Sequence, residues 1–185
     1  QPSGKVWLIS GKHGCICVLD SAFNIREFTT ENNMLYSDLV YEVYEDKQGD
    51  SWILTDNGLY QLKKDSPKPI PYFINSPYTG SFRLPFYCYA DVNDEIWFGS
   101  SRGQLRRYNK EKKTFGLVKL PCKQEINGIY ASKPVAGKGA GDTQATKKQG
   151  GQPDTSFPEE LVITTSGGGI FILRLSDLTI ENYTT

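Results

Sequence analysis

The chain contains a single histidine and four cysteines among its 185 residues, and no CxxC pair occurs. Zinc sites in proteins are built mainly from clusters of these residue types, so we expect no metal site. A lone histidine also leaves little material for acid–base catalysis by imidazole groups. The composition therefore does not favour metalloenzymes or histidine-based hydrolases, and it implies no cofactor.

Net charge and long apolar runs are lacking as well. The 21 basic and 21 acidic side chains cancel, which gives no indication of nucleic acid or an anionic membrane surface as a partner. No run approaches the roughly 18 apolar residues of a membrane-spanning helix. The start, QPSGKVW, lacks the charged and apolar regions of a signal peptide. If the protein is exported, we expect this chain to be a mature or excised piece.

The cysteines have two interpretations. Cys15 and Cys17 are two residues apart in a predicted strand and point to one side, an arrangement poorly suited to bonding each other. We expect all four cysteines to be reduced, buried packing residues. A disulfide between Cys88 and Cys122 is the alternative in an oxidising compartment.

What the chain does contain is a repeat. The segments VWLISGKHGCICVL, DSWILTDNGLYQL and EIWFGSSRGQLRRY each carry a tryptophan in an apolar run, then polar residues with glycine, then a second apolar run. Trp7, Trp52 and Trp97 follow one another at intervals of 45 residues. A fourth copy, LVITTSGGGIFIL, has Val162 in the place of the tryptophan, 65 residues after Trp97. The surplus of twenty matches an inserted low-complexity tract, so the chain is periodic.

Each copy predicts four short strands. The apolar runs at 6–9, 52–54, 96–98 and 161–163 are typical of strands covered on both faces. The turns that follow, DNG and SRG, end in glycine, as a tight reversal with positive φ requires. A third strand is marked by an apolar residue eighteen positions after the tryptophan or its substitute, and stretches 39–45 and 84–90 predict a fourth. Four strands in about 45 residues make one β-propeller blade.

The predicted fold is all-β, with about four four-stranded antiparallel sheets arranged as propeller blades. We place an incomplete blade at 4–28 and further blades at 39–74, 84–120 and 126–183. The last holds an insertion, 133–157, whose glycine, lysine and threonine content predicts a disordered loop. The count is fifteen strands, because the first blade lacks its innermost one. We expect a partial propeller, an open arc of blades.

The repeat resembles a known family. EDKQGDSWILTDNGL and ADVNDEIWFGSSRGQL are similar to the two-component regulator propeller repeat, and the resemblance covers the chain outside the insertion. That repeat builds the extracytoplasmic sensor regions of Bacteroides-type hybrid two-component regulators, many of which sense oligosaccharides. The resemblance implies a non-enzymatic sensor segment of a periplasmic propeller, part of a membrane-anchored parent protein. It also implies an oligosaccharide ligand, and as partners the remaining blades of the parent or a second copy of the chain.

Two other functions stay open. One is a propeller lyase resembling streptogramin lyases, whose blades have a similar repeat; this chemistry is expected to need a histidine acid or base, and His13 is the only histidine. The other is a structural or protein-binding propeller fragment whose exposed ends adhere to other sheets.

The resemblance carries no ligand residues, so candidates come from position. In such a blade the turn between the second and third strands emerges on the same face as the loop to the next blade, and function often resides on loops held by a scaffold. That face supplies aromatic surface and hydrogen-bonding groups for a neutral oligosaccharide. The candidates are His13, Tyr36, Asp56, Asn57, Tyr78, Phe82 and Arg102.

Two further groups of residues are assigned to structure. We expect the tryptophans to pack between blades, because each sits at the same place in a repeat with apolar neighbours. The acidic residues that precede them, such as Asp46 and Asp91, lack the spacing of a calcium loop and are expected to shape turns through their side chains.

Overall fold

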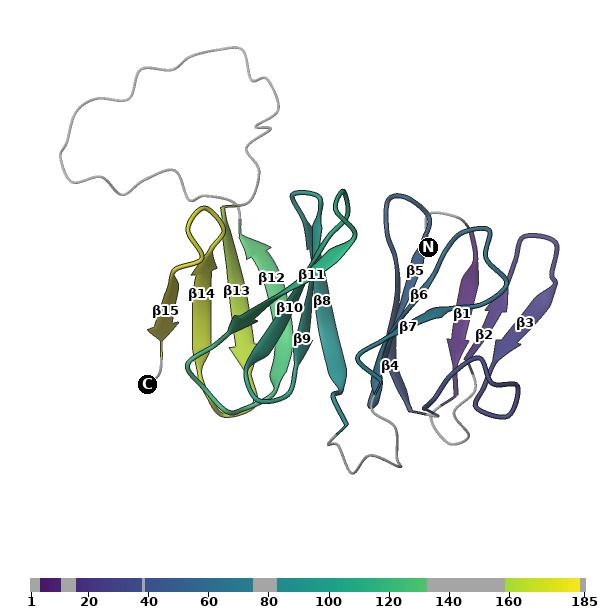
Figure 1. Cartoon of the computed structure of the whole chain (residues 1–185), viewed down its shortest axis with the longest axis horizontal. Helices are drawn as coiled ribbons and strands as arrows, with labels where there is room; N and C mark the ends of the chain where they lie inside the picture. The colour runs from purple at the N-terminus through teal and green to yellow at the C-terminus, as the bar shows by residue number, and fades with distance from the viewer. Residues whose placement is uncertain (1–3, 11–15, 38, 75–82, 133–158, 184–185) are drawn as a thin grey trace, which may run out of the picture.

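The structure is a computed structural model that describes residues 4–10, 16–37, 39–74, 83–132 and 159–183. Across these ranges it contains fifteen β-strands in four antiparallel sheets. The described ranges contain no helix of the length and apolarity needed to cross a membrane. Each sheet is a meander, in which strands that follow one another in sequence pair side by side. Figure 1 shows the four sheets standing in a row in chain order.

We name the sheets blade 1 to blade 4 in that order. Blade 1 consists of β1 (Val6–Ile9), β2 (Ile16–Leu19) and β3 (Ile25–Phe28). Blade 2 consists of β4 (Val40–Glu45), β5 (Ser51–Thr55), β6 (Gly58–Leu62) and β7 (Ile70–Tyr72). Blade 3 consists of β8 (Phe86–Val92), β9 (Glu95–Ser100), β10 (Gln104–Asn109) and β11 (Thr114–Lys119). Blade 4 consists of β12 (Ile126–Ser132), β13 (Glu160–Thr165), β14 (Ile170–Arg174) and β15 (Ile180–Tyr183).

The turns between the second and third strands depend on glycine, as the sequence predicts. Gly58 has φ +99° and Gly103 has φ +63°, a region that L side chains rarely adopt. A Cβ atom at Gly58 would lie 2.4 Å from Cδ1 of Ile74, and one at Gly103 would lie 2.6 Å from the carbonyl oxygen of Cys122. Both glycines are therefore required by backbone conformation and by space.

The first strand of each four-stranded sheet carries an irregularity at the same place. Pairing with the second strand shifts between Val40 and Glu42, between Phe86 and Cys88, and between Ile126 and Gly128. Such a β-bulge leaves one extra residue and increases the local twist. The strands β4, β8 and β12, here called the inner strands, contact one another in sequence across neighbouring blades.

The core is divided into three apolar clusters, one for each interface between neighbouring blades. Blade 1 meets blade 2 around Phe28 and Ile53, and blade 3 meets blade 4 around Trp97 and Phe171. Between blades 2 and 3, Trp52 is fully buried, with its ring centroid 5.2 Å from that of Phe98 and 4.8 Å from that of Tyr108. The prediction that the tryptophans pack between blades is confirmed, although Trp7 is only half-buried.

The expectation that all four apolar runs are covered on both faces is wrong for β1. Val6, Leu8 and Ile9 are 49%, 57% and 43% exposed. Val162, in the fourth run, is only half-buried. Blades 1 and 4 are the two ends of the row, so within the described residues each has a neighbour on one side only. No described strand pairs with the second edge of β1, in agreement with the predicted count of fifteen.

The described cysteines are free thiols, and the alternative of a Cys88–Cys122 disulfide is not found. Cys88 is buried, whereas Cys17 and Cys122 are half-buried, so full burial was wrong for these two. Cys15 and the insertion 133–157 lie outside the described residues.

Candidate functional site

The turns between the second and third strands lie on the same face as the segments between blades, as the sequence analysis expects. The amide of Gly58 donates to the carbonyl of Leu84 at 3.0 Å, and that of Gly103 donates to Gln124 at 2.7 Å. In blade 4 the amide of Ser166 donates to Glu125 at 3.0 Å. In blades 2 and 3 the turn is thereby attached to the segment that leads into the next blade. In blade 4 it is attached to the segment that leads into its own inner strand.

Two of the predicted loop residues are held by structural contacts on this face. Asp56 accepts hydrogen bonds from the Ser37 hydroxyl and from the Arg83 guanidinium, which tie the turn to both flanking interblade segments. Asn57 is only 4% exposed, and its Nδ2 donates to the carbonyl of Tyr36 at 3.5 Å. These contacts fasten the loops to the sheets.

The remaining candidates are spread out or undescribed. Tyr36 is 65% exposed, and its amide donates to the Tyr60 hydroxyl at 2.7 Å. Arg102 is exposed at φ +59° in the corresponding turn of blade 3. His13, Tyr78 and Phe82 lie outside the described residues. The structure thus brings Tyr36, Asp56 and Asn57 together, and their role in binding a ligand stays a prediction.

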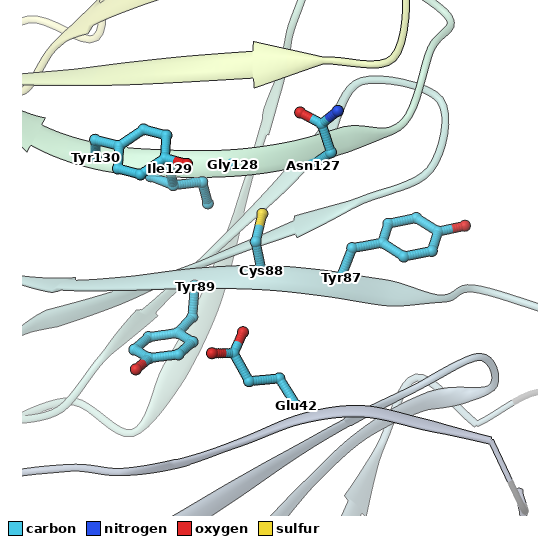
Figure 2. Close-up of a pocket in the computed structure, with 8 residues that line it drawn as sticks. All are labelled: Glu42, Tyr87, Cys88, Tyr89, Asn127, Gly128, Ile129 and Tyr130. Carbon is cyan, nitrogen blue, oxygen red and sulfur yellow. The ribbon is translucent and has the colours of Figure 1, made fainter. Parts of the chain in front are cut away.

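A groove of about 340 Å³ runs along the inner strands and was missed by the sequence analysis. It is formed by β4, β8 and β12, so three blades contribute to it (Figure 2). We call it the inner-strand groove. Its lining consists of Glu42, Tyr87, Cys88, Tyr89, Asn127, Gly128, Ile129 and Tyr130. A concave site with a few convergent polar groups and aromatic walls is typical of a small-ligand pocket.

Equivalent positions of the three inner strands line the groove. Glu42, Cys88 and Gly128 are equivalent positions, paired with Leu54, Gly99 and Thr164 just after the bulge of each inner strand. A Cβ atom at Gly128 would lie 2.5 Å from the Thr164 hydroxyl and 2.9 Å from the Tyr130 ring. Only glycine therefore permits the Tyr130 ring to lie over this part of β12.

The aromatic rings of the groove are positioned by their neighbours. The Tyr89 ring is stacked on Tyr44, with centroids 4.0 Å apart. The Tyr87 ring lies 5.0 Å from that of Tyr41, and its side chain is hydrogen-bonded to Glu125. Burial and this carboxylate raise the pKa of Tyr87, so its hydroxyl stays protonated. Tyr130 is 61% exposed and presents its ring to solvent.

Glu42 is the one charged residue within the described part of the groove lining. Its side chain is half-buried, and burial raises the pKa of its carboxyl group above the ordinary value. The structure shows no hydrogen bond or ion pair between its carboxylate and another described residue. In Figure 2 its carboxylate lies beside the Tyr89 ring, between β4 and β8.

Asp91, by contrast, has an ion-pair partner. Nζ of Lys110 lies 2.6 Å and 2.7 Å from its two carboxylate oxygens, and the Tyr44 hydroxyl donates to Oδ2. Both charged side chains are almost fully buried. The expectation that Asp91 shapes a turn is wrong, because this ion pair occupies its side chain. For Asp46 the same expectation is confirmed, since its Oδ1 accepts from the amides of Gln48 and Asp50.

In chemical terms the groove offers aromatic faces, hydroxyl and amide groups, and one carboxylate, Glu42, that has no counter-ion in the described ranges. Within the described ranges, no three His, Cys, Asp or Glu side chains gather closely enough to hold a metal ion. One sequence signal pointed to the groove: Glu42 is a carboxylate at the position where the other two copies have Cys88 and Gly128. Recognising it required the strand register, because Trp52 pairs with Tyr44, eight residues before it, whereas Trp97 pairs with Ala90, seven residues before it.

No protein-family model and no curated protein sequence matches the chain. Solved structures do. The chain superposes with TM-score 0.70 and 14% identity on the extracellular domain of BT4673 from B. thetaiotaomicron, described as a hybrid two-component system. The match covers 98% of this chain and 21% of that one.

A streptogramin B lyase matches with TM-score 0.65 and 19% identity, over 100% of this chain and 52% of that one. Virginiamycin B lyase from Staphylococcus aureus, solved as an inactive variant with quinupristin, matches with TM-score 0.54 and 19% identity, over 98% and 66% of the two chains. The chain therefore spans about a fifth of the first protein and about half of the second. These likenesses show the fold: the four sheets are β-propeller blades, as the repeat predicts.

Proposed function

We propose that the chain is a non-enzymatic sensor segment of a periplasmic β-propeller in a hybrid two-component regulator, and that it takes part in sensing an oligosaccharide. The observation that carries the proposal is the inner-strand groove, in which residues from three blades form one concave surface. The fold likeness to an extracellular domain of such a regulator supports the same context at 14% identity.

The chemistry of the groove suits a sugar. A sugar ring has an apolar face of C–H groups and an edge of hydroxyls, and a tyrosine likewise has an apolar body and a polar tip. Tyr87, Tyr89 and Tyr130 supply ring surface, while Asn127 and Glu42 supply hydrogen-bonding groups. The stacking of Tyr89 on Tyr44 fixes one ring in advance, which lowers the entropy lost on binding.

The partners proposed for the segment are the remaining blades of a parent propeller or a second copy of the chain. Exposed apolar side chains at both ends of the row support this proposal. Leu8 and Ile25 are 57% and 67% exposed on blade 1, and Ile170 is 45% exposed on blade 4. Burying such faces against another sheet is how blades 1 to 4 already pack on one another.

Isothermal titration against a panel of neutral oligosaccharides tests the proposed function, first with this chain and then with the longer protein that contains it. We expect at least one sugar to bind, and Tyr130→Ala to weaken that binding about tenfold, in line with the loss of one aromatic contact. Tyr36→Ala is the matched variant on the loop face. Loss of binding in Tyr36→Ala alone would move the site to the loops, and uniform silence of the panel would overturn the proposal.

A propeller lyase is the second candidate, because a streptogramin B lyase shares the fold over the whole of this chain. Incubation with a streptogramin B antibiotic, followed by mass spectrometry, distinguishes the two. A sensor segment leaves the antibiotic intact. A product formed by wild type and abolished by His13→Ala would establish the lyase instead.

A further inference from the structure

We infer that the inner-strand groove binds a ligand that carries a protonated amine, with Glu42 as the counter-ion and the Tyr89 ring as the wall beside it. The inference rests on the proposed function for the rest of the ligand, an oligosaccharide, and specifies it as one that contains an amino sugar.

The charges around the groove are the first argument. Among the residues that the structure describes, its lining includes one carboxylate, Glu42, and no Lys or Arg. The other acids in the vicinity already have partners: Asp91 is paired with Lys110, and Glu125 is hydrogen-bonded to Tyr87. Among the described lining residues, the one charge is thus the negative charge of Glu42, which favours a cationic ligand and disfavours an anionic one.

The surroundings of the Glu42 carboxylate are the second argument. It is half-buried without a hydrogen-bond donor from the described residues, and its environment favours the protonated acid. The titratable group of β8 on the same side, Tyr89, is held in its neutral form by a raised pKa, and so is the Cys88 thiol, which points toward β12 (Figure 2). A partly desolvated carboxylate gains most from a ligand that brings both N–H donors and positive charge.

The aromatic wall is the third argument. One face of the Tyr89 ring is covered by Tyr44, and the Glu42 carboxylate lies at its side in Figure 2. An ammonium group is attracted both to a carboxylate and to the face of an aromatic ring. Toward β12 the groove continues past Cys88 and Tyr87 to Asn127 and Tyr130 (Figure 2), where uncharged sugar units find aromatic surface and an amide.

Calorimetric titration with two matched probes tests the inference: a tetramer of β-1,4-linked glucosamine and its fully N-acetylated, uncharged counterpart. At about pH 6 the free amines of the first probe are largely protonated. We expect wild type to bind the charged tetramer at least about tenfold more tightly than the neutral one, as one charge-assisted contact implies. Glu42→Gln should abolish this preference, so that the ratio of the two affinities falls to about one.

Glu111→Gln is the control variant, because it removes an exposed carboxylate outside the groove. It should preserve the preference, which separates local recognition from a change in net charge. Equal affinity for both tetramers in wild type, or a preference that survives in Glu42→Gln, would overturn the amine inference and leave oligosaccharide sensing intact.

If neither tetramer binds, the result counts against oligosaccharide sensing. A third probe, Nα-acetyl-lysine methylamide, then decides the amine site independently of any sugar. Binding of this probe that is lost in Glu42→Gln would support the site, and absence of binding would overturn it.

Discussion

The indole Nε1 of Trp52 donates a hydrogen bond to Oδ2 of Asp46 at 3.1 Å, while Oδ1 of the same carboxylate accepts from two turn amides. One buried acid thereby joins the core between blades 2 and 3 to the turn between β4 and β5. The corresponding indole of blade 3 is different, because Nε1 of Trp97 has no hydrogen-bond partner among the described residues. Copies of one repeat thus differ in whether a described residue accepts a hydrogen bond from this buried indole.

This contact predicts that Asp46→Asn is destabilising. The amide oxygen can still serve the turn, but the carboxylate oxygen that faces the indole is replaced by a donor. We expect a loss of about 1–3 kcal/mol in the free energy of unfolding, measured by urea denaturation. Asp94→Asn is the control, since Asp94 is exposed in the tight turn of blade 3 at φ +61°. Equal stability of both variants would contradict the assigned role.

The buried pair of Asp91 and Lys110 predicts a strong coupling. Removal of one partner leaves an uncompensated buried charge, so Asp91→Asn and Lys110→Met should each lose about 3–5 kcal/mol. The double variant should lose clearly less than the sum of the two. A double-mutant cycle in urea measures the difference, and additive losses would show that the pair does not interact.

Glu42 predicts a pH-dependent gain of stability in Glu42→Gln. Because burial raises the pKa of this carboxyl in the folded state, the folded protein holds the proton more tightly than the unfolded chain does. The stabilising effect of protonation is complete below the unfolded pKa and is lost as pH rises through the folded pKa. Glu42→Gln should therefore melt about 1–2 °C higher than wild type near pH 7. The two should coincide near pH 4, and the opposite order at neutral pH would contradict the assignment.

The turn glycines predict different costs for the same substitution. Gly58→Ala meets both a positive φ and Cβ contacts of 2.4 Å and 2.7 Å, whereas Gly167→Ala meets a positive φ with nothing within 4 Å. We expect Gly167→Ala to lose about 1 kcal/mol and Gly58→Ala clearly more. The difference in stability between the two variants, measured by thermal denaturation, gives the contribution of the close contacts at Gly58. Equal losses would show that the neighbours of Gly58 adjust without cost.

The exposed face of blade 1 predicts self-association of the isolated segment. Leu8→Lys places a charge in the middle of this apolar face and should shift the protein toward the monomer in size-exclusion chromatography with light scattering. Glu111→Lys, which adds positive charge at an exposed position of blade 3, should leave the mass unchanged. A wild-type monomer at all concentrations would argue against a second copy as the partner.

The blade architecture was accessible from the sequence because it rests on local signals. The 45-residue spacing of Trp7, Trp52 and Trp97 sets the repeat, and glycine at the end of a turn reflects backbone sterics that need no knowledge of distant residues. Apolar runs marked the second strands correctly. They did not indicate that β1 is exposed, since exposure depends on whether another sheet lies against it.

The groove is formed only by the tertiary structure. The pairing register makes Glu42, Cys88 and Gly128 equivalent, and only the packing of three blades brings them to one groove. The distinction between Asp91, neutralised by Lys110, and Glu42, which has no such partner among the described residues, likewise depends on contacts between residues far apart in sequence. Local patterns determine where strands begin and turn, because they act on neighbouring residues; the environment of a charge is set by whichever side chains the folded sheets bring to it.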